Sequence, residues 1–496
     1  MTLAKSLLLG SVTAFAAVAG AQAADLPSRK SAPVNYVKIC DAYGAGFFFI
    51  PGTDTCLKVG GYVRAEWQYT PAQSTITVSG GGVPALTAIA GSQDTTGTEV
   101  RGRVDLDART PTALGTVRTS VRLRAANTSG IRNSNNTNNA NITFSTASAT
   151  GITIEQAMVQ WAGFTFGVAP ENYAMMPSQF YTANAWAGFP NGMKQIAYTA
   201  TFGGGFSATI AIEDRTDWGY VPTAAAAAPS TTYNHTPLNG YALVGNLRVD
   251  QSWGFAAVHG VVNNNSIRSD GLVNATALGI IGNAAGNGGN GNANPLVGSQ
   301  TKTGWGIGAT AKFNLPMIAA GDAIWITANY ANGHIGALLS NGGLNQLANA
   351  SGKRFLGGIQ RTDQNLYVTS GTCTVANTCT IGTATGWNIA AAATHYWTPQ
   401  WRSNFSAGYV EINPPTVSAT ANGGGAAAMQ WGKGRTWEVR GSLIYSPAKN
   451  FDIGLEVQYM NMKNNVQNPT AAFIAAGSPG LSRDGVTTHL RIERSF

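Results

Sequence analysis

The chain has 496 residues, of which only 11% are charged, and its formal net charge is +8. Soluble domains carry roughly 25% charged residues, and no run of lysine or arginine marks a nucleic-acid surface, so a nucleic-acid-binding protein is not expected. The low charge, the 61 glycines and the many aromatic residues fit a barrel with one face in lipid, with a soluble β-repeat protein as the alternative.

The first 23 residues have the pattern of a secretory signal. A single Lys5 precedes an apolar stretch over residues 7–19, and Ala21 and Ala23 frame a small-residue cleavage site. We expect cleavage after Ala23, which would leave a net charge of +7 because Lys5 is lost. No later window reaches the roughly 18 apolar residues of a membrane helix, so a helical membrane protein is excluded.

Four cysteines are arranged in two close pairs. An even count in an exported chain suggests two disulfides, and pairing within each segment is the simplest of three connectivities. No Cys-x-x-Cys spacing occurs, so neither a zinc nor a redox centre is expected. Residues 24–56 are predicted to form a periplasmic N-terminal segment with the first disulfide. The cysteines are Cys40 and Cys56, then Cys373 and Cys379.

Beyond residue 56, segments with a strand pattern are separated by turns, and these turns are alternately short and long. Apolar and polar residues alternate within these segments, as expected of strands with two different faces. The alternation is less clear over 151–161 and 253–263. The predicted strands cover residues 57–69, 98–109, 116–127, 151–161, 164–169, 193–202, 206–213, 240–250, 253–263, 302–314, 322–332, 385–397, 401–412, 436–445, 451–462 and 485–496.

The last strand shows most clearly what kind of sheet this is. Val486, Leu490 and Ile492 share one parity, whereas His489 and Arg491 share the other, and the strand ends on the aromatic Phe496. A charged face suits a water-filled interior, and the apolar face then lies in lipid. An even number of strands with short turns on one rim and long loops on the other predicts a transmembrane barrel. We therefore predict an all-β fold, a sixteen-stranded antiparallel barrel over residues 57–496 with short periplasmic turns and long extracellular loops.

Charged residues are concentrated on three neighbouring strands. If their polar parity faces the lumen, seven arginines line one wall with three interleaved acids, and they would set a strong transverse field. We interpret this wall as an ion-sorting constriction, with structural Arg–Asp pairing as the alternative. The residues are Arg64, Arg101, Arg103, Arg109, Arg118, Arg122, Arg124, Asp105, Asp107 and Glu66.

The third long loop, residues 170–192, is unusually apolar for a loop at a rim in water. It holds several aromatics, among them Tyr173 and Tyr181, and Glu171 is its only acid. We expect it to fold into the barrel and narrow it, with Glu171 facing the arginines. A loop that covers a subunit contact is the alternative.

Catalytic and metal-binding patterns are weak. The five histidines do not share one face at a ligand spacing, and neither a Gly-x-Ser-x-Gly nor a His-Glu-x-x-His motif occurs. We expect no enzyme activity, no metal and no cofactor.

Residues 37–64 carry a family resemblance. Cys40 and Cys56 flank Gly-Phe-Phe-Phe-Ile-Pro-Gly-Thr-Asp-Thr, and residues 160–167 read Gln-Trp-Ala-Gly-Phe-Thr-Phe-Gly. These stretches, with the terminal Phe496, closely resemble the alphaproteobacterial porins. The resemblance implies a trimeric, sixteen-stranded general-diffusion porin in the outer membrane, with its third loop folded inward. Such porins usually place several acids in that loop, and this chain has only Glu171, so the arginines would favour anions.

We therefore expect passive diffusion of small hydrophilic solutes and ions across the bacterial outer membrane, with lipid, lipopolysaccharide and a homotrimer as partners. One alternative is a channel specific for sugars or organic anions, in which Tyr173 and Tyr181 form a sliding surface. The other is a closed structural or adhesive barrel whose Asn/Gly-rich loops bind.

Overall fold

A computed structural model describes residues 38–70, 75–79, 83–87, 95–130, 149–177, 179–181, 192–214, 241–267, 300–339, 366–370, 380–416, 430–467 and 482–496. The chain divides into two compact units, residues 1–56 and 57–496. The predicted signal segment and the predicted Cys373–Cys379 disulfide lie outside the described residues.

The first unit is held together by a disulfide. It contains the short 3₁₀ helix η1 (Asp41–Tyr43) and the strand β1 (Phe47–Phe49), and Cys40 is bonded to Cys56 with their Cα atoms 6.0 Å apart. Phe47 is buried with both cysteines. A segment this small cannot build a large core, so a covalent link supplies the order that burial cannot. The predicted Cys40–Cys56 pairing is confirmed.

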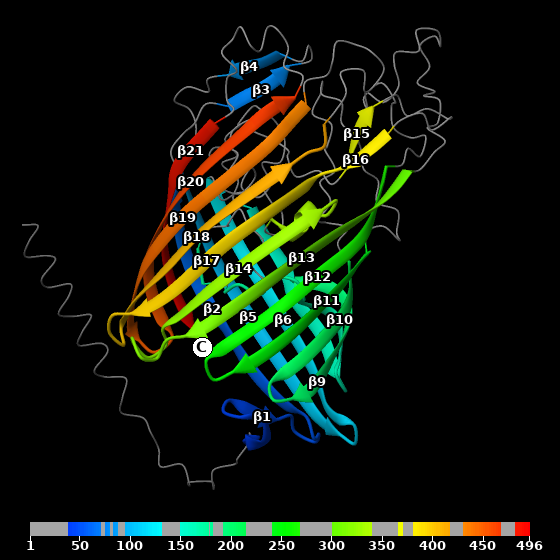
Figure 1. Cartoon of the computed structure of the whole chain (residues 1–496). Coiled ribbons are helices and arrows are strands. Elements are labelled where there is room, and N and C mark those ends of the chain that lie inside the picture. Colours follow the sequence, from blue (N-terminus) through cyan, green and yellow to red (C-terminus); the bar gives the residue numbers. More distant parts are fainter. Residues whose placement is uncertain are drawn as a thin grey trace, which may run out of the picture. The chain divides into compact units, whose positions relative to one another are not determined.

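The second unit contains a closed antiparallel barrel of sixteen strands (Figure 1). Consecutive strands pair along the chain, and β21 returns to pair with β2, so the sheet has no free edge. The predicted fold and all sixteen predicted strands are confirmed. The barrel strands are β2 (Cys56–Tyr69), β5 (Thr96–Thr112), β6 (Gly115–Gly130), β7 (Ala149–Trp161), β8 (Phe164–Pro170), β9 (Gly192–Gly203), β10 (Phe206–Asp214), β11 (Tyr241–Gln251), β12 (Gly254–Ile267), β13 (Gln300–Asn314), β14 (Ala323–Asn332), β17 (Thr385–Tyr396), β18 (Trp401–Asn413), β19 (Gln430–Ala448), β20 (Phe451–Gln467) and β21 (Ser482–Ser495).

The predicted loops contain two further hairpins. The strands β3 (Thr75–Ser79) and β4 (Val83–Thr87) form one two-stranded sheet, and β15 (Leu366–Ser370) and β16 (Thr380–Thr383) form another. The sequence pattern predicts loops over both segments, and segments of four or five residues are too short to show two distinct strand faces. Pairing within each hairpin satisfies backbone groups that a structureless loop would leave to water.

The outer surface of the barrel is apolar and is bounded by aromatic residues at two heights. Trp305 contacts Tyr330 near one end of β13, and Trp253 stacks on Phe313 near the other end. Trp305 and Phe313 are eight residues apart on one strand, which corresponds to about 27 Å along it. A strand tilt of about 35–45° shortens this to about 19–22 Å along the barrel axis, the same order as an apolar band about 25 Å tall between two aromatic girdles. Among the described residues, no helix is long and apolar enough to cross a membrane.

The first and last strands meet at a tight seam. Phe496 and Gly61 exchange two backbone hydrogen bonds, of 3.0 and 3.3 Å. A Cβ atom on Gly61 would collide with the carbonyl oxygen of Arg103 and lie 2.9 Å from Cζ of Phe496. Only glycine lets the backbones of β2, β5 and β21 approach this closely.

Candidate functional site

The seven predicted arginines lie on the inward parity of β2, β5 and β6. On β5 the outward residues Val100 and Val104 are 55% and 45% exposed and face the membrane side. Because successive side chains point to opposite faces, Arg101 and Arg103 point inward, as do the acids that follow them. The register sets Arg103 opposite Arg124 and Arg109 opposite Arg118, with Asp105 opposite Arg122. We call this surface of β2, β5, β6 and β7 the arginine wall.

Ion pairs connect the arginine wall along and across its strands. Asp107 accepts hydrogen bonds from Arg109 at 3.0 Å and from Arg118 at 3.1 Å. Asp105 pairs with Arg122 at 2.7 Å and with Arg103 at 2.9 Å. Each of these two carboxylates therefore bridges two guanidiniums, which leaves the wall with more positive than negative groups.

The seam between β2 and β21 extends the network with residues that sequence reasoning did not list as a site. Arg64 pairs with Glu493, and Arg491 pairs with the predicted Glu66, in each case at 2.5 Å. Glu66 is only 2% exposed. Arg491 and Glu493 already share the polar parity of the last strand, so the alternation could have identified them once the barrel was known to close there. Arg101 pairs with Glu99 on its own strand.

A β-bulge places one more carboxylate in the arginine wall. The register between β6 and β7 pairs Arg122 with Gln156 and Leu123 with Ile154, so Glu155 is the extra residue. Its carboxylate lies 3.1 Å from Nη1 of Arg124 and 4.0 Å from Nη1 of Arg103. A bulge shifts the side-chain parity of its strand. This shift explains why apolar and polar residues do not alternate regularly over residues 151–161. It also explains why the sequence pattern does not place Glu155 on the arginine wall.

The third loop begins by anchoring itself to the wall next to its own strand. The backbone N–H of Asn172 donates to Glu213 of β10 at 2.8 Å, and its side-chain amide donates to Gln195 of β9 at 2.6 Å. Tyr173 is 1% exposed and its ring lies 4.5 Å from that of His259 on β12.

Further along, the third loop reaches the far side of the barrel. Gln179 donates to Thr394 of β17 at 2.7 Å, and Phe180 lies against Arg440 of β19 with 4.9 Å from its ring centroid to Cζ. The Tyr181 N–H donates to Glu456 of β20 at 2.9 Å, and its ring lies 3.8 Å from Cζ of Arg491. The loop therefore follows the inner wall from β10 to β21, which confirms that it folds inward.

Glu171 is buried at the start of the loop, next to Asn172, and is 5% exposed. That its carboxylate faces the arginines stays a prediction. Tyr173 is equally covered. Among the described residues of the loop, Tyr181 contacts Arg491, which pairs with Glu66 of the arginine wall.

A second inward segment follows β14, where the sequence interpretation placed only an extracellular loop. It contains η3 (Ile335–Ala337). The buried residues, each at most 3% exposed, are His334, Ile335, Ala337, Leu338 and Leu339. Asn388 donates to the carbonyl of Leu338 at 2.5 Å. The inward-facing glycines of the neighbouring strands make room for the segment. A Cβ on Gly306 would lie 2.7 Å from Cβ of Ala337, and one on Gly386 would lie 2.6 Å from Cδ1 of Leu338.

This second segment packs into an apolar cluster on the inner face of the barrel. Such a cluster excludes water from one side of the lumen, because apolar side chains on the inward parity replace the usual polar ones. Its members are Tyr173, Ala197, Ala211, Ala242, Val244, Val261, Ala331, Ile335, Ala337, Leu338, Leu339, Ala384, Val410, Ile412, Met460 and Met462.

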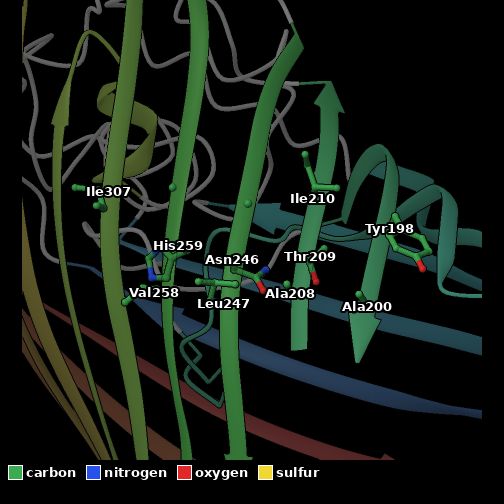
Figure 2. A pocket seen from close by; sticks show the side chains of 12 residues that line it. Tyr198, Ala200, Ala208, Thr209, Ile210, Asn246, Leu247, Val258, His259 and Ile307 are labelled. Atoms are coloured by element: carbon green, nitrogen blue, oxygen red, sulfur yellow. The ribbon is translucent and has the colours of Figure 1, made fainter. Parts of the chain in front are cut away.

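A hollow in the outer wall is separate from this interior (Figure 2). It lies across β9 to β13, where Ala208 and Gly245 leave space between Tyr198, Leu247 and Ile307. The exposed side chains around it are apolar and share the parity of the lipid-facing residues. The hollow therefore faces the membrane and does not belong to a path through the barrel. No group of three or more potential metal ligands occurs among the described residues.

A closed antiparallel barrel with an apolar outer band and a charged interior is a membrane-spanning β-barrel protein. Residues 25–480 match the family model described as "Porin subfamily". The chain therefore belongs to this porin family, which places it in the bacterial outer membrane and confirms the resemblance seen in the sequence.

Curated relatives and a solved structure agree with the family. Porin Omp2b of Brucella abortus (strain 2308) is 34% identical over 285 residues, which cover 53% of this chain and 66% of the relative. Porin Omp2b of Brucella canis is 35% identical over the same length and the same shares. The match thus spans slightly less than two thirds of these relatives. The outer membrane channel DcaP of Acinetobacter baumannii has the same fold, with a TM-score of 0.55, 15% identity, and coverage of 90% of this chain and 99% of that chain.

Proposed function

We propose that the barrel is a water-filled channel for passive diffusion of small hydrophilic solutes and ions, and that the arginine wall biases it toward anions. The observation that carries the proposal is an excess of guanidiniums on a partly exposed wall. Seven arginines of the wall and Arg491 are accompanied there by six carboxylates, Glu66, Glu99, Asp105, Asp107, Glu155 and Glu493.

Exposure supports an action of these charges on solutes. The side chains of Arg118, Arg122 and Arg124 are 33%, 37% and 30% exposed. Arginine keeps its charge at any physiological pH, and a narrow passage with low-dielectric walls focuses the field of its lining charges. Ion pairing reduces this field but does not cancel it, because the carboxylates are fewer.

A salt-gradient measurement tests the proposal. Planar bilayers with the refolded protein should show conductance steps and a reversal potential of anion preference. Changing Arg118, Arg122 and Arg124 together to Ala should move the reversal potential toward cations. An absence of conductance would refute the channel, whereas an unmoved reversal potential would refute only the selectivity role of the wall.

We further propose a homotrimer in contact with lipid and lipopolysaccharide, because the outward residues form an apolar band that either lipid or another protomer can cover. Conductance steps in multiples of three would support the trimer. A substrate-specific channel with Tyr173 in a sliding surface is disfavoured, since that side chain is 1% exposed. We expect a channel and no enzyme activity.

A further inference from the structure

Two arginines of the wall differ from the others in the hydrogen bonds that their guanidiniums make. The Nε atoms of Arg64, Arg101, Arg109, Arg118 and Arg122 all donate to a carboxylate. The Nε atoms of Arg103 and Arg124 are buried and have no hydrogen-bond partner in the described part of the chain. The wall therefore holds two guanidiniums with unused donors.

These two arginines also directly face each other. Arg103 on β5 and Arg124 on β6 are register partners. Directly opposed residues of an antiparallel pair have Cα atoms about 4.5–5.5 Å apart, and like charges in such a pair are destabilising. The arrangement requires a negative group between the two side chains. Asp105 contacts Arg103 at 2.9 Å but is already shared with Arg122.

Glu155 supplies that negative group, and only because of the bulge. One of its oxygens lies 3.1 Å from Arg124, and the other lies 4.0 Å from Arg103, which is too long for a hydrogen bond. The carboxylate thus forms a hydrogen-bonded pair with Arg124 and only a loose contact with Arg103, whose bonded partner is Asp105. Its side chain is 23% exposed, and those of Arg103 and Arg124 are 24% and 30% exposed, so solvent reaches all three groups.

We propose that Arg103 and Arg124 form a subsite for an oxyanionic group of a permeating solute, a phosphate or a carboxylate, with Glu155 as its intramolecular competitor. Planar guanidinium donors match the oxygens of such anions in a bidentate manner. An incoming anion takes the place of Glu155 between the two arginines, and the carboxylate turns toward solvent. This inference rests on the proposed function, because the anion reaches the subsite through a water-filled lumen.

The inference is tested by phosphate block of chloride current through single channels. Glu155→Gln removes the competitor, and the phosphate concentration for half block should fall about threefold. This is the change in affinity expected when one partly exposed ion pair no longer competes. The double variant Arg103→Gln/Arg124→Gln should lose the block. Glu493→Gln is the control for the first change, since Glu493 is 22% exposed and is paired with Arg64. Arg109→Gln/Arg118→Gln is the control for the second, because these residues are also directly opposed.

The controls should move the reversal potential without changing the phosphate block. Equal block in all variants would overturn the subsite and leave the channel in place. Broadening of the phosphate ³¹P resonance by the refolded protein in detergent provides a readout that needs no current. Broadening that is stronger with Glu155→Gln and absent with the double arginine variant supports the subsite, and broadening that is unaffected by either overturns it even if no conductance is found.

Discussion

The two sides of the barrel interior use the same kinds of charged residue in opposite ways. On the arginine wall the side chain of Arg122 is 37% exposed, whereas on β19 those of Arg440 and Glu438 are both 0% exposed. Phe180 of the third loop covers Arg440, and the segment after β14 joins the apolar cluster nearby. Charges on the first wall are partly exposed to solvent, whereas those on the second contact a loop that covers them. We refer to the inner face of β13, β17, β19 and β20, which the third loop and the segment after β14 contact, as the covered wall.

The comparison predicts very different costs for removing a charge from each wall. Glu438→Ala removes one partner of the fully buried ion pair between Glu438 and Arg440, and we expect the free energy of unfolding to fall by about 3–5 kcal/mol. Arg122→Ala breaks a partly exposed pair and should cost less than about 1 kcal/mol. Urea titration of the folded protein measures both. Equal losses would show that the two walls do not differ in this way.

A charge introduced into the buried segment after β14 should displace that segment from the inner wall. Leu338 is 0% exposed within the apolar cluster, and Leu338→Asp would bury an unpaired carboxylate at a cost of several kcal/mol. We expect residues 334–339 to leave the inner wall and single-channel conductance to rise. Leu114→Asp, at a turn position that is 66% exposed, is the control. A folded Leu338→Asp protein with unchanged conductance would mean that the segment does not narrow the passage.

A smaller effect on stability is expected from a buried carboxylate, that of Asp322, in the short turn before β14. Asp322 is 4% exposed, with Oδ2 at 2.6 Å from Nδ1 of His395 and Oδ1 accepting the N–H of Tyr396 at 2.8 Å. Burial alone would raise the pKa of Asp322, but the hydrogen bonds from His395 and Tyr396 outweigh it and hold the pKa below its usual range.

The lowered pKa of Asp322 defines the pH range in which its carboxylate stabilises the fold. The ionised Asp322 stabilises the fold above the ordinary carboxyl pKa of about 4, and this contribution is lost as pH falls through the lower folded value. We expect Asp322→Asn to lower the denaturation midpoint at pH 7 and to match the unchanged protein more closely at pH 3. A difference that persists undiminished at pH 3 would contradict this assignment.

The arginine wall could be predicted from sequence because it depends only on alternation. Arg101 and Arg103 must share a face in any strand, and the same holds for Arg122 and Arg124. Glu155 could not be predicted, because a single unpaired residue reverses the parity of β7 and the residues themselves do not mark its position.

The covered wall depends on partners that are distant in the chain. Ala337 fits against the inner wall only because position 306 of β13 is glycine, and Leu338 fits only because position 386 of β17 is glycine. Each residue looks unremarkable alone, since glycine in a strand and leucine in a loop have many explanations. The same holds for Glu171, whose burial follows from where the loop turns and not from its composition.

The seam between β2 and β21 also constrains how the protein is assembled. Arg64 and its partner Glu493 are 429 positions apart in the chain, so the closing contacts are among the most non-local that this sequence can make. Closing so long a loop is entropically costly before any pairing compensates for it, and topologies of this kind form slowly. Until β21 has paired, β2 and β20 each present an open strand edge to other chains. The barrel is thus most vulnerable to mispairing before β21 pairs with β2 and β20.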